Sequence, residues 1–378
     1  MGNVIIFKVV SLPPIIHSIE MGKVAVFVFV ALSVLALVLG LAQSFEFEAR
    51  ELETKDSLWE LYERWTKHFK VSRDPSEKQM RLSLFKDKAN YVHEFNNKKD
   101  RTSYELELNI FSDMTELEVK EFVTCYDSSY DKRDMHHHRH HHHHQRGLTI
   151  PSSIDWRAEG AVTSVKYQGR CGSCWAFSAV AAIEGLNKIK NQSLVVLSEQ
   201  QIIDCNKASY ACCGGWYSNS FQNIITYNGL TTETNYPYTC EYVSCDNGTN
   251  ANLTCKPLEI VPPLVTITDY GWVDSNNESA LKEAVAIQPI SVAIDSSGAD
   301  FQGYKEGIFV GPCGTETNHA VTIVGYGTDT VGTGYDYWIV KNSWGTTWGD
   351  QGYIYMRRGI SAKEGLCGIA QYPAYPIK

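Results

Sequence analysis

Residues 127–149 differ in composition from the sequence on either side of them. The segment begins with Asp, Ser, Lys and Arg and continues with eight histidines between His136 and His144, interrupted only by Arg139. This composition cannot bury enough apolar surface to fold, so we expect an exposed linker. The histidine tract has three interpretations: a tag or accident of composition, nonspecific metal chelation, or a pH-responsive role, since histidine titrates near pH ~6.5.

The sequence before this linker predicts a small, mostly helical domain. Apolar residues recur at spacings of three and four between residues 56 and 97, with an interruption at Pro75-Ser76, which favours two packed helices. Residues 104–111 alternate in the manner of a strand, and a short helix is expected to begin near Thr115.

Residues 21–42 show the pattern of a signal peptide. Met21-Gly-Lys precedes an apolar run from Val24 to Leu41, and cleavage is expected after Ala42. The alternative is a membrane anchor, because about 20 apolar residues span a bilayer. No second hydrophobic segment follows, which favours the signal peptide, and residues 1–20 are interpreted as an upstream extension before the initiator Met21.

Passage through an oxidising compartment would make the cysteines available for disulfides. Ten of the eleven cysteines follow residue 170. Four Asn-x-Ser/Thr sequons are compatible with glycosylation on the same route, at Asn191, Asn247, Asn252 and Asn277. The net charge of −9, without a long cluster of Lys and Arg, excludes the electrostatic footprint of a nucleic-acid or anionic-membrane binder.

The sequence after Ile150 predicts an α+β fold. Residues 173–189 form a long helical pattern, and short segments rich in Val, Ile and Tyr follow from Val265 onward. Helices first and strands later indicate an α+β protein with two lobes. The strands are expected at Ile290–Ile294, Ala320–Tyr326, Tyr337–Val340 and Tyr353–Met356.

Two residues of this second part are candidates for nucleophilic chemistry. Cys174 lies at the start of the long helix, where unpaired N–H groups and the helix dipole stabilise a thiolate. His319 is the only histidine after the linker, so it is the one candidate there for a general base. Structural alternatives exist for both: Cys174 as a disulfide partner, and His319 as a hydrogen-bonded core histidine.

The segment from Gln168 to Ser178, which contains Cys171-Gly-Ser-Cys174-Trp175, resembles the active-site signature of papain-like cysteine proteases. The resemblance implies a papain-like two-lobed fold, with a helical lobe and a β-barrel-like lobe, and is closest in style to the plant enzymes of the vignain type. It covers nearly all of residues 150–378 through Asp155–Arg157, Leu197–Gln201, Asp204-Cys205, Cys212–Gly215, Tyr236–Tyr238, Gln302–Cys313, Asn318–Ala320 and Lys341–Gly345.

This resemblance implies a role for each residue that matches the family motifs. Cys174 would be the nucleophile, His319 the general base and acid, and Asn342 the amide that orients the imidazole. Gln168 and the backbone N–H of Cys174 would bind the oxyanion, and Trp344 would shield the contact between His319 and Asn342. The implied substrate-binding positions form a mostly apolar pocket, in which a strong preference for arginine is not expected: Gly214, Gly215, Trp216, Ala293, Thr317, Asn318, Ala320, Trp344 and Tyr372.

Three disulfides are implied by the same resemblance: Cys171–Cys212, Cys205–Cys245 and Cys313–Cys367. Cys213, Cys240 and Cys255 remain. We expect Cys213 to pair with Cys240 and Cys255 to be the odd cysteine, although spacing alone does not determine connectivity.

The part before the linker resembles the inhibitory propeptide of the family. An unchecked protease would digest its own cell, so this domain is expected to cover Cys174 until processing near Thr149. Two positions depart from the family pattern: Lys88 stands where Asn is usual, and Glu107 where Gly is common. The matching positions are Glu77, Arg81, Phe85, Val92, Asn96, Asn109, Phe111 and Asp113.

The expected product is a cysteine endopeptidase zymogen that hydrolyses peptide bonds in an acidic compartment, with no cofactor and no metal. Its expected partners are peptide and protein substrates, its own propeptide and cystatin-like inhibitors, and we expect a monomer. The expected divisions are the extension and signal peptide at 1–42, the propeptide domain at 43–126, the activation linker at 127–149 and the peptidase domain at 150–378.

Two other functions are weighed against this one: a catalytically silent homologue and a histidine-rich metal-binding secreted protein. Silent homologues usually lose the nucleophile or the base, and both are present here. Within the secretory pathway the destination stays open between vacuole or lysosome and the extracellular space, because the chain ends at Tyr375–Lys378 without a Lys-Asp-Glu-Leu tail.

Overall fold

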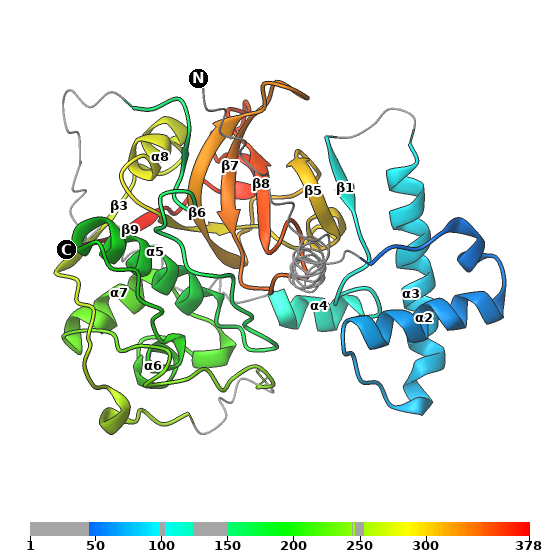
Figure 1. Ribbon diagram of the computed structural model, residues 1–378, viewed down its shortest axis with the longest axis horizontal. Helices are drawn as coiled ribbons and strands as arrows, with labels where there is room; N and C mark the ends of the chain where they lie inside the picture. Colours follow the sequence, from blue (N-terminus) through cyan, green and yellow to red (C-terminus); the bar gives the residue numbers. More distant parts are fainter. Residues whose placement is uncertain (1–44, 99–102, 124–149, 244, 246–252) are drawn as a thin grey trace, which may run out of the picture. The chain divides into compact units, whose positions relative to one another are not determined.

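The computed structural model describes residues 45–98, 103–123, 150–243, 245 and 253–378. We call residues 45–123 the N-terminal region and residues 150–378 the C-terminal region (Figure 1). The signal-peptide run, the histidine tract, and the sequons at Asn247 and Asn252 lie outside the described residues. Among the described helices, none has the length and apolar character needed to cross a membrane.

The two helices expected in the N-terminal region are confirmed as α2 (Lys55–His68) and α3 (Pro75–Asn96). Each begins at a side-chain cap, since Thr54 Oγ1 accepts the N–H of Ser57 and Asp74 accepts the N–H of Ser76. Their apolar faces meet through buried aromatic rings, and η2 (Ala49–Leu52) precedes them.

Two ion pairs, the first of them buried, connect these helices to the chain that follows. Arg73 forms a bidentate pair with Asp113, with its shorter N–O distance at 2.7 Å, and Tyr62 donates a hydrogen bond to the same carboxylate. Arg81 forms a second pair with Glu118, at the start of α4 (Glu116–Val123). These contacts fix the chain between the helices and α4.

The strand expected over residues 104–111 is shorter than predicted, and forms only as β1 (Tyr104–Leu106). Beyond it, Asn109 Oδ1 accepts the N–H of Phe111, and Ser112 Oγ accepts the N–H of Asn109. Such local side-chain bonds turn the backbone and end the strand despite the continuing alternation. β1 pairs antiparallel with β5 (Tyr304–Phe309), so the N-terminal region adds a strand to the sheet of the C-terminal region.

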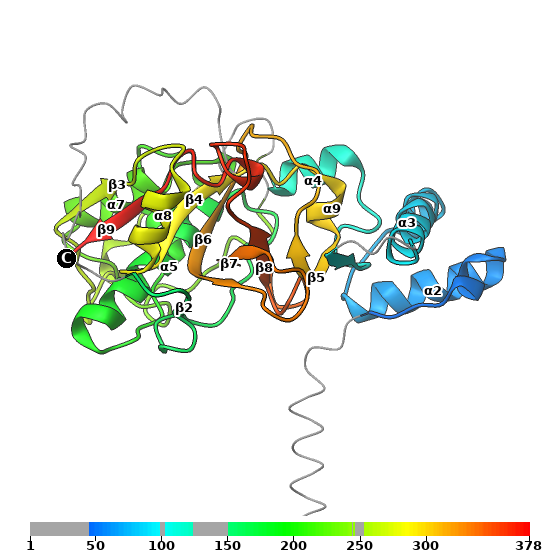
Figure 2. The ribbon, with the colours of Figure 1, turned by 90° about the horizontal axis from the view of Figure 1, so that it is seen from above.

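The C-terminal region places helices on one side and a sheet on the other, which confirms the α+β class (Figures 1 and 2). The expected long helix is α5 (Cys174–Asn191), which contacts α7 (Tyr217–Thr226) and β6 (His319–Thr328). Because both faces of α5 are covered, most of its residues are buried. The shorter elements are α6 (Glu199–Cys205), η4 (Ala211–Cys213), η6 (Pro257–Glu259), α8 (Glu278–Val285), α9 (Ala299–Gln302) and η7 (Leu366–Gly368).

The sheet has the strand order β1-β5-β8-β7-β6-β4-β9-β3, and β2 pairs with β6 off this path. The pairing of β5 with β8 is parallel, whereas β6 is antiparallel to both β4 and β7. All four expected strands are present. The remaining bounds are β2 (Ile154–Asp155), β3 (Asp269–Trp272), β4 (Ile290–Ile294), β7 (Asp336–Lys341), β8 (Tyr353–Arg357) and β9 (Ala374–Ile377).

Two of the four disulfides between described cysteines differ from the expected pairing. Cys171–Cys212 and Cys313–Cys367 are present, as the family resemblance implies. The expected pairs Cys205–Cys245 and Cys213–Cys240 are wrong, because the structure contains Cys205–Cys255 and Cys213–Cys245 instead.

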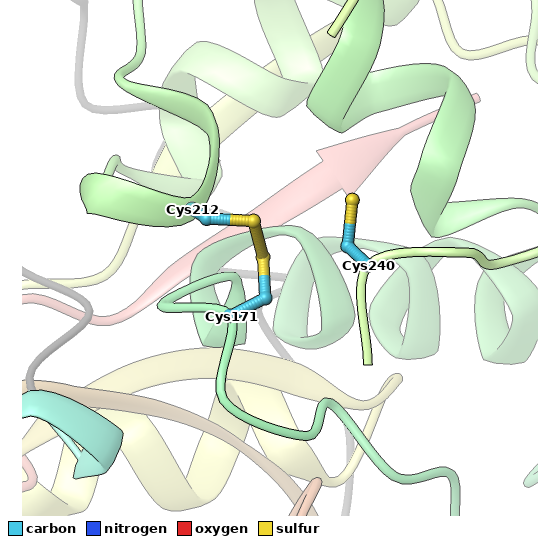
Figure 3. Close-up of side chains that lie close together, drawn as sticks. All are labelled: Cys171, Cys212 and Cys240. Atoms are coloured by element: carbon cyan, nitrogen blue, oxygen red, sulfur yellow. A yellow bond between two sulfur atoms is a disulfide. The ribbon is translucent and has the colours of Figure 1, made fainter. Parts of the chain in front are cut away.

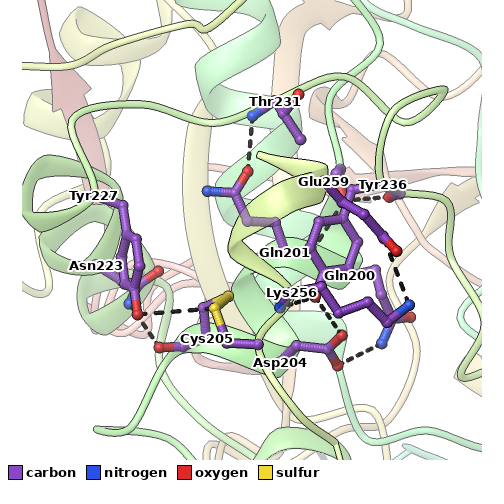
Figure 4. Close-up of a disulfide and its surroundings, with 12 residues drawn as sticks. Gln200, Gln201, Asp204, Cys205, Asn223, Tyr227, Thr231, Tyr236, Lys256 and Glu259 are labelled. Atoms are coloured by element: carbon purple, nitrogen blue, oxygen red, sulfur yellow. Dashed lines mark hydrogen bonds and ion pairs between the residues drawn. A yellow bond between two sulfur atoms is a disulfide. The ribbon is translucent and has the colours of Figure 1, made fainter. Parts of the chain in front are cut away.

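The location of Cys240 and Cys255 explains the difference. Cys240 is buried beside the Cys171–Cys212 bridge, with the three sulfurs within 4.8 Å of one another (Figure 3), and is the free cysteine among the described residues. Cys255 lies next to the end of α6, beside the Tyr227 hydroxyl at 3.9 Å, and takes Cys205 (Figure 4). Cys245 is then left for Cys213.

Candidate active site

The loop before α5 fixes the position of Cys174. Gly169 has φ +63°, and a Cβ added there would lie 1.9 Å from the carbonyl oxygen of Glu241, so the turn requires glycine. The Cys171–Cys212 disulfide joins the same loop to η4. Cys174 then begins α5, and its sulfur accepts the backbone N–H of Ala320 at 3.2 Å. The sulfur therefore lies where the helical lobe meets the start of β6.

Cys174 is itself disulfide-bonded in this structure. This is the structural alternative that the sequence left open for the residue. A sulfur in a disulfide cannot ionise and is not a nucleophile, because thiolate is the reactive form of cysteine. The structure thus presents the expected nucleophile in a covalently blocked state.

His319 begins β6, where it pairs with Ile294 of β4. Its Nε2 donates to Asn342 Oδ1 at 2.8 Å, and the backbone N–H of Ser343 donates to the same oxygen at 2.8 Å. Burial lowers the pKa of His319 to about 4, against the opposing effect of the Asn342 hydrogen bond. The imidazole is therefore neutral above that pH while the site is blocked.

Trp344 covers one face of this imidazole. The two rings are stacked with centroids 4.7 Å apart and an interplanar angle of 25°. The indole is fully buried, so it excludes water from its side of the contact between His319 and Asn342.

Gln168 lies in a polar network in the loop before α5. Its Nε2 donates to the carbonyl of Cys171 at 3.0 Å, and its Oε1 accepts from the hydroxyl of Ser343 at 2.6 Å. Tyr238 donates to the Gln168 carbonyl at 2.6 Å. The sequence did not identify Ser343 and Tyr238 as members of this network, although each is part of a motif that carries the family resemblance.

The positions expected to bind substrate gather in two places. Trp216, Ala293 and Ala320 belong to one apolar cluster, against which Tyr372 packs, with its ring edge-to-face to Trp216 at 5.5 Å. Gly215 precedes them, and an added Cβ there would lie 2.7 Å from the Trp175 indole. Thr317 and Asn318 instead line a cavity of about 1050 Å³ that opens between the N-terminal and C-terminal regions.

The N-terminal region packs directly against the indole beside His319. Phe111 lies edge-to-face against Trp344 at 5.0 Å, and Phe122 lies 6.4 Å from it. Asn109 donates to the carbonyl of Gln302 at 2.7 Å, and Tyr104 donates to Asp300 at 2.5 Å. These contacts come from β1, from α4 and from the loop between them, and they hold the N-terminal region against the Trp344 indole and residues 300–302.

A buried cluster of charged side chains lies behind the site and was missed in the sequence. Lys166 Nζ lies 2.7 Å from Glu199 and 3.2 Å from Glu184. Lys341 Nζ donates to Thr163 at 2.9 Å, and burial lowers its pKa to about 8. The available signal was charge at apolar positions, since Glu184 interrupts the apolar α5 and Lys341 ends the apolar β7.

Comparisons with known proteins agree with this architecture. The model of the papain family cysteine protease matches residues 150–377, and the cathepsin propeptide inhibitor domain (I29) matches residues 62–119. Vignain from Ricinus communis is 50% identical over 361 residues, covering 93% of this chain and 94% of the relative. Vignain from Vigna mungo is 48% identical over 347 residues, which cover 91% of this chain and 92% of the relative.

Solved proforms share the fold of both regions. The proform of the ragweed pollen cysteine protease Amb a 11 has a TM-score of 0.78 at 38% identity, and the match covers 89% of this chain and 99% of that one. Recombinant stem bromelain precursor has a TM-score of 0.72 at 42% identity, and the match covers 85% of this chain and 98% of that one. The chain therefore belongs to the papain family of cysteine proteases, as an endopeptidase precursor that carries the family's propeptide inhibitor domain.

Proposed function

We propose that Cys174, His319, Asn342 and Gln168 carry out peptide hydrolysis once the N-terminal region is removed and the disulfide of Cys174 is reduced. The observation that carries this proposal is the short contact between His319 Nε2 and Asn342 Oδ1, next to a backbone N–H that points at the Cys174 sulfur. This contact orients the imidazole, and in the proposed mechanism its other nitrogen exchanges the proton with the sulfur.

Reduction changes the state of the imidazole as well as that of the sulfur. A thiol at the start of α5 loses its proton readily because of the helix dipole. The resulting thiolate favours a protonated His319, which opposes the effect of burial on its pKa. The reactive state is thus a thiolate–imidazolium pair that the blocked structure cannot contain.

Acylation then follows from the positions of these groups. The Cys174 thiolate attacks the carbonyl carbon of the scissile peptide, and the carbonyl oxygen becomes an oxyanion near the side-chain amide of Gln168. The His319 imidazolium gives its proton to the leaving amine, the C–N bond breaks, and a thioester remains on Cys174.

Deacylation reverses the roles. A water molecule replaces the amine, neutral His319 takes a proton from it, and the hydroxide attacks the thioester. The carboxylic acid product leaves and the thiolate–imidazolium pair re-forms. Asn342 keeps the ring orientation during both proton transfers, because its amide oxygen accepts from Nε2 without adding a charge.

Peptide hydrolysis by the processed, reduced enzyme tests this assignment. Cys174→Ala is expected to abolish hydrolysis, because the variant lacks the sulfur that attacks the peptide, and to leave the fold intact, because alanine is compatible with the start of α5. Cys240→Ala removes a buried thiol that has no role in the proposed mechanism and is expected to keep the parent activity. Full activity of the Cys174→Ala enzyme would exclude the mechanism.

The apolar cluster of Trp216, Ala293, Ala320 and Tyr372 supports a preference for an apolar residue at the second position before the scissile bond. No carboxylate stands at position 372 to hold an arginine. Tyr372→Glu is therefore expected to raise the ratio of kcat/KM for Arg over Leu at that position by at least tenfold. Tyr372→Phe, which keeps the ring, serves as the control, and an unchanged ratio in the Glu variant would place the pocket elsewhere.

The same proposal includes a route and a division of the chain. Four disulfides between described cysteines favour synthesis in an oxidising compartment, with the vacuole, lysosome or extracellular space as destination. Relatives include a KDEL-tailed cysteine endopeptidase of Arabidopsis thaliana. The proposed boundaries remain 1–42, 43–126, 127–149 and 150–378, and mass spectrometry of the secreted, processed protein measures the cleavage sites and the glycans at Asn191 and Asn277.

A further inference from the structure

Asn342 has one polar group that the contacts around His319 leave unexplained. Its Oδ1 accepts both from the ring and from the backbone of Ser343. Its Nδ2 is buried and has no hydrogen-bond partner among the residues that the structure describes. A buried amide N–H is rarely left unsatisfied in native proteins, so an acceptor is expected beside this atom.

A small cavity of about 20 Å³ adjoins Asn342. A site of at least ~10–15 Å³ with two to four polar partners admits a water molecule. The volume therefore fits one water. The polar residues of the lining come from five separate segments: Lys166, Ser178, Glu184, Glu199, Thr322, Lys341, Asn342 and Ser343.

The carboxylates of the charged cluster are the natural acceptors for this water. Lys166 donates to both oxygens of Glu199, at 2.7 and 2.9 Å, and Thr163 donates to Glu184 at 2.6 Å. A carboxylate oxygen has two lone pairs, so each of these oxygens can accept one more bond. The other carboxylate close to Lys166, Glu233, does not line the cavity.

We propose that one water in this cavity accepts the Nδ2–H of Asn342 and donates to Glu199, which makes Glu199 a positioning residue for the Asn342–His319 pair. The water fixes the amide with its oxygen toward the ring, and the carboxylate polarises the water and the amide, which makes Asn342 Oδ1 a stronger acceptor and favours the charged form of the imidazole. Glu184 strengthens the effect of the Glu199 charge on the imidazole, whereas Lys166 and Lys341 weaken it. The net effect therefore depends on all four side chains around the water. The inference rests on the proposed roles of His319 and Asn342.

Replacing Glu199 by Gln removes the charge and keeps the shape. In the processed, reduced enzyme, Glu199→Gln is expected to lower kcat about tenfold with little change in KM. The alkaline limb of kcat/KM against pH, which reports loss of the imidazolium proton, is expected to move about one pH unit lower. Glu233→Gln removes a neighbouring carboxylate outside the cavity and is expected to leave both quantities unchanged.

A double-mutant cycle separates this role from a merely structural one. If Glu199 acts through Asn342, the effect of Glu199→Gln disappears in an Asn342→Ala background. Ala181→Val fills the cavity without changing any charge, and it is expected to reproduce the loss of kcat. It also decides the question if Glu199→Gln does not fold.

Three outcomes are distinguishable. Effects that vanish in the Asn342→Ala background support the positioning role. Equal effects in both backgrounds, or a parent pH profile in both the Glu199→Gln and Ala181→Val enzymes, would overturn it while leaving the proposed function intact. If Asn342→Ala alone keeps the parent activity, the proposed function itself fails.

Discussion

The two regions of the chain bury charge and resist unfolding in different ways. The N-terminal region pairs arginine with carboxylates, as in Arg73–Asp113 and Arg81–Glu118, and its described residues include no cysteine. The C-terminal region buries lysine with glutamate and is crosslinked by four disulfides between described cysteines. One region depends on interactions that protons can break, and the other on bonds that reductants can break.

The acid sensitivity of the N-terminal region has a definite direction. The hydrogen bonds from Arg81 lower the pKa of Glu118 to about 2, from a usual value of 4.5. The stabilisation from this pair is therefore fully present above pH 4.5 and is lost as the pH falls toward 2. Acid can thus loosen the inhibitor while the crosslinked C-terminal region persists.

The largest expected effect comes from reduction. Because Cys174 is disulfide-bonded, enzyme freed from its N-terminal region without a reductant is expected to show roughly a hundredth of the reduced activity or less. A mild reductant should restore hydrolysis as free thiols appear. Peptide hydrolysis measured beside a thiol count checks this, with Cys240→Ala as a matched control that has one thiol fewer. Full activity before any thiol is released would show that the C-terminal region does not depend on reduction for its activity.

Breaking the Arg73–Asp113 ion pair tests whether the N-terminal region depends on its ion pairs for stability. Asp113→Ala leaves Arg73 and Tyr62 buried without their shared acceptor, and it is expected to destabilise the N-terminal region by about 3–5 kcal/mol. The measurement is hydrogen exchange of α2 and α3 in the full precursor, made inactive by Cys174→Ala. Glu63→Ala removes the more exposed pair with Lys78, and a change of about 1 kcal/mol or less is expected. Equal effects of the two variants would contradict the assignment.

Glu107 is expected to make the N-terminal region weaker at alkaline pH, opposite to the effect of Glu118. Burial raises the pKa of Glu107 to about 8, partly offset by Lys305, and its Oε1 has no partner among the described residues. Its folded pKa lies above 4.5, so stability falls as the pH rises from 4.5 through 8, by on the order of a few kcal/mol.

Glu107→Gln should therefore slow self-activation of the precursor at pH ~9 and leave it nearly unchanged at pH ~4. Rates of precursor cleavage at the two pH values measure this. Glu105→Gln, at the more exposed carboxylate near Lys305, is the control. A difference that is larger in acid than in alkali would show that the buried carboxyl does not act as described.

The smallest expected effect comes from removing one helix cap in each of the two regions. Thr54→Ala removes the cap of α2, and Ser198→Ala removes the cap of α6, each worth about 1 kcal/mol. Thr54→Ala is expected to increase hydrogen exchange only in the N-terminal region, and Ser198→Ala only in the C-terminal region. Exchange that spreads into the other region in either variant would mean that the two unfold together.

Local patterns predicted the regular elements well, because burial imposes a period on the sequence. The strand at Ile290–Ile294 has the predicted bounds, and the two helices of the N-terminal region begin near their capping residues. The strand at 104–111 was too long in the prediction, since the side chain of Asn109 turns the backbone while the apolar alternation continues.

Contacts between distant residues were harder to predict. The adjacent cysteines 212 and 213 are equivalent in sequence but take different partners, and the partner depends on where residues 240–255 lie in space. Neither the disulfide of Cys174 nor the lysine–glutamate cluster leaves a periodic signal. The proposed site residues come from sequence motifs, whereas the buried charged groups near them could be identified only in the three-dimensional structure.

The pairing of β1 with β5 has a consequence for the finished enzyme. Loss of the N-terminal region removes the outermost strand, β1, from the sheet. The backbone of residues 304–309 then becomes an exposed edge strand, with which strands of other chains can pair. Two charged side chains, Lys305 and Glu306, and the left-handed Gly307 at φ +90° make this edge a poor template for a new strand. Maturation thus exposes an edge strand that could promote aggregation. The charged side chains and the glycine of β5 limit this aggregation.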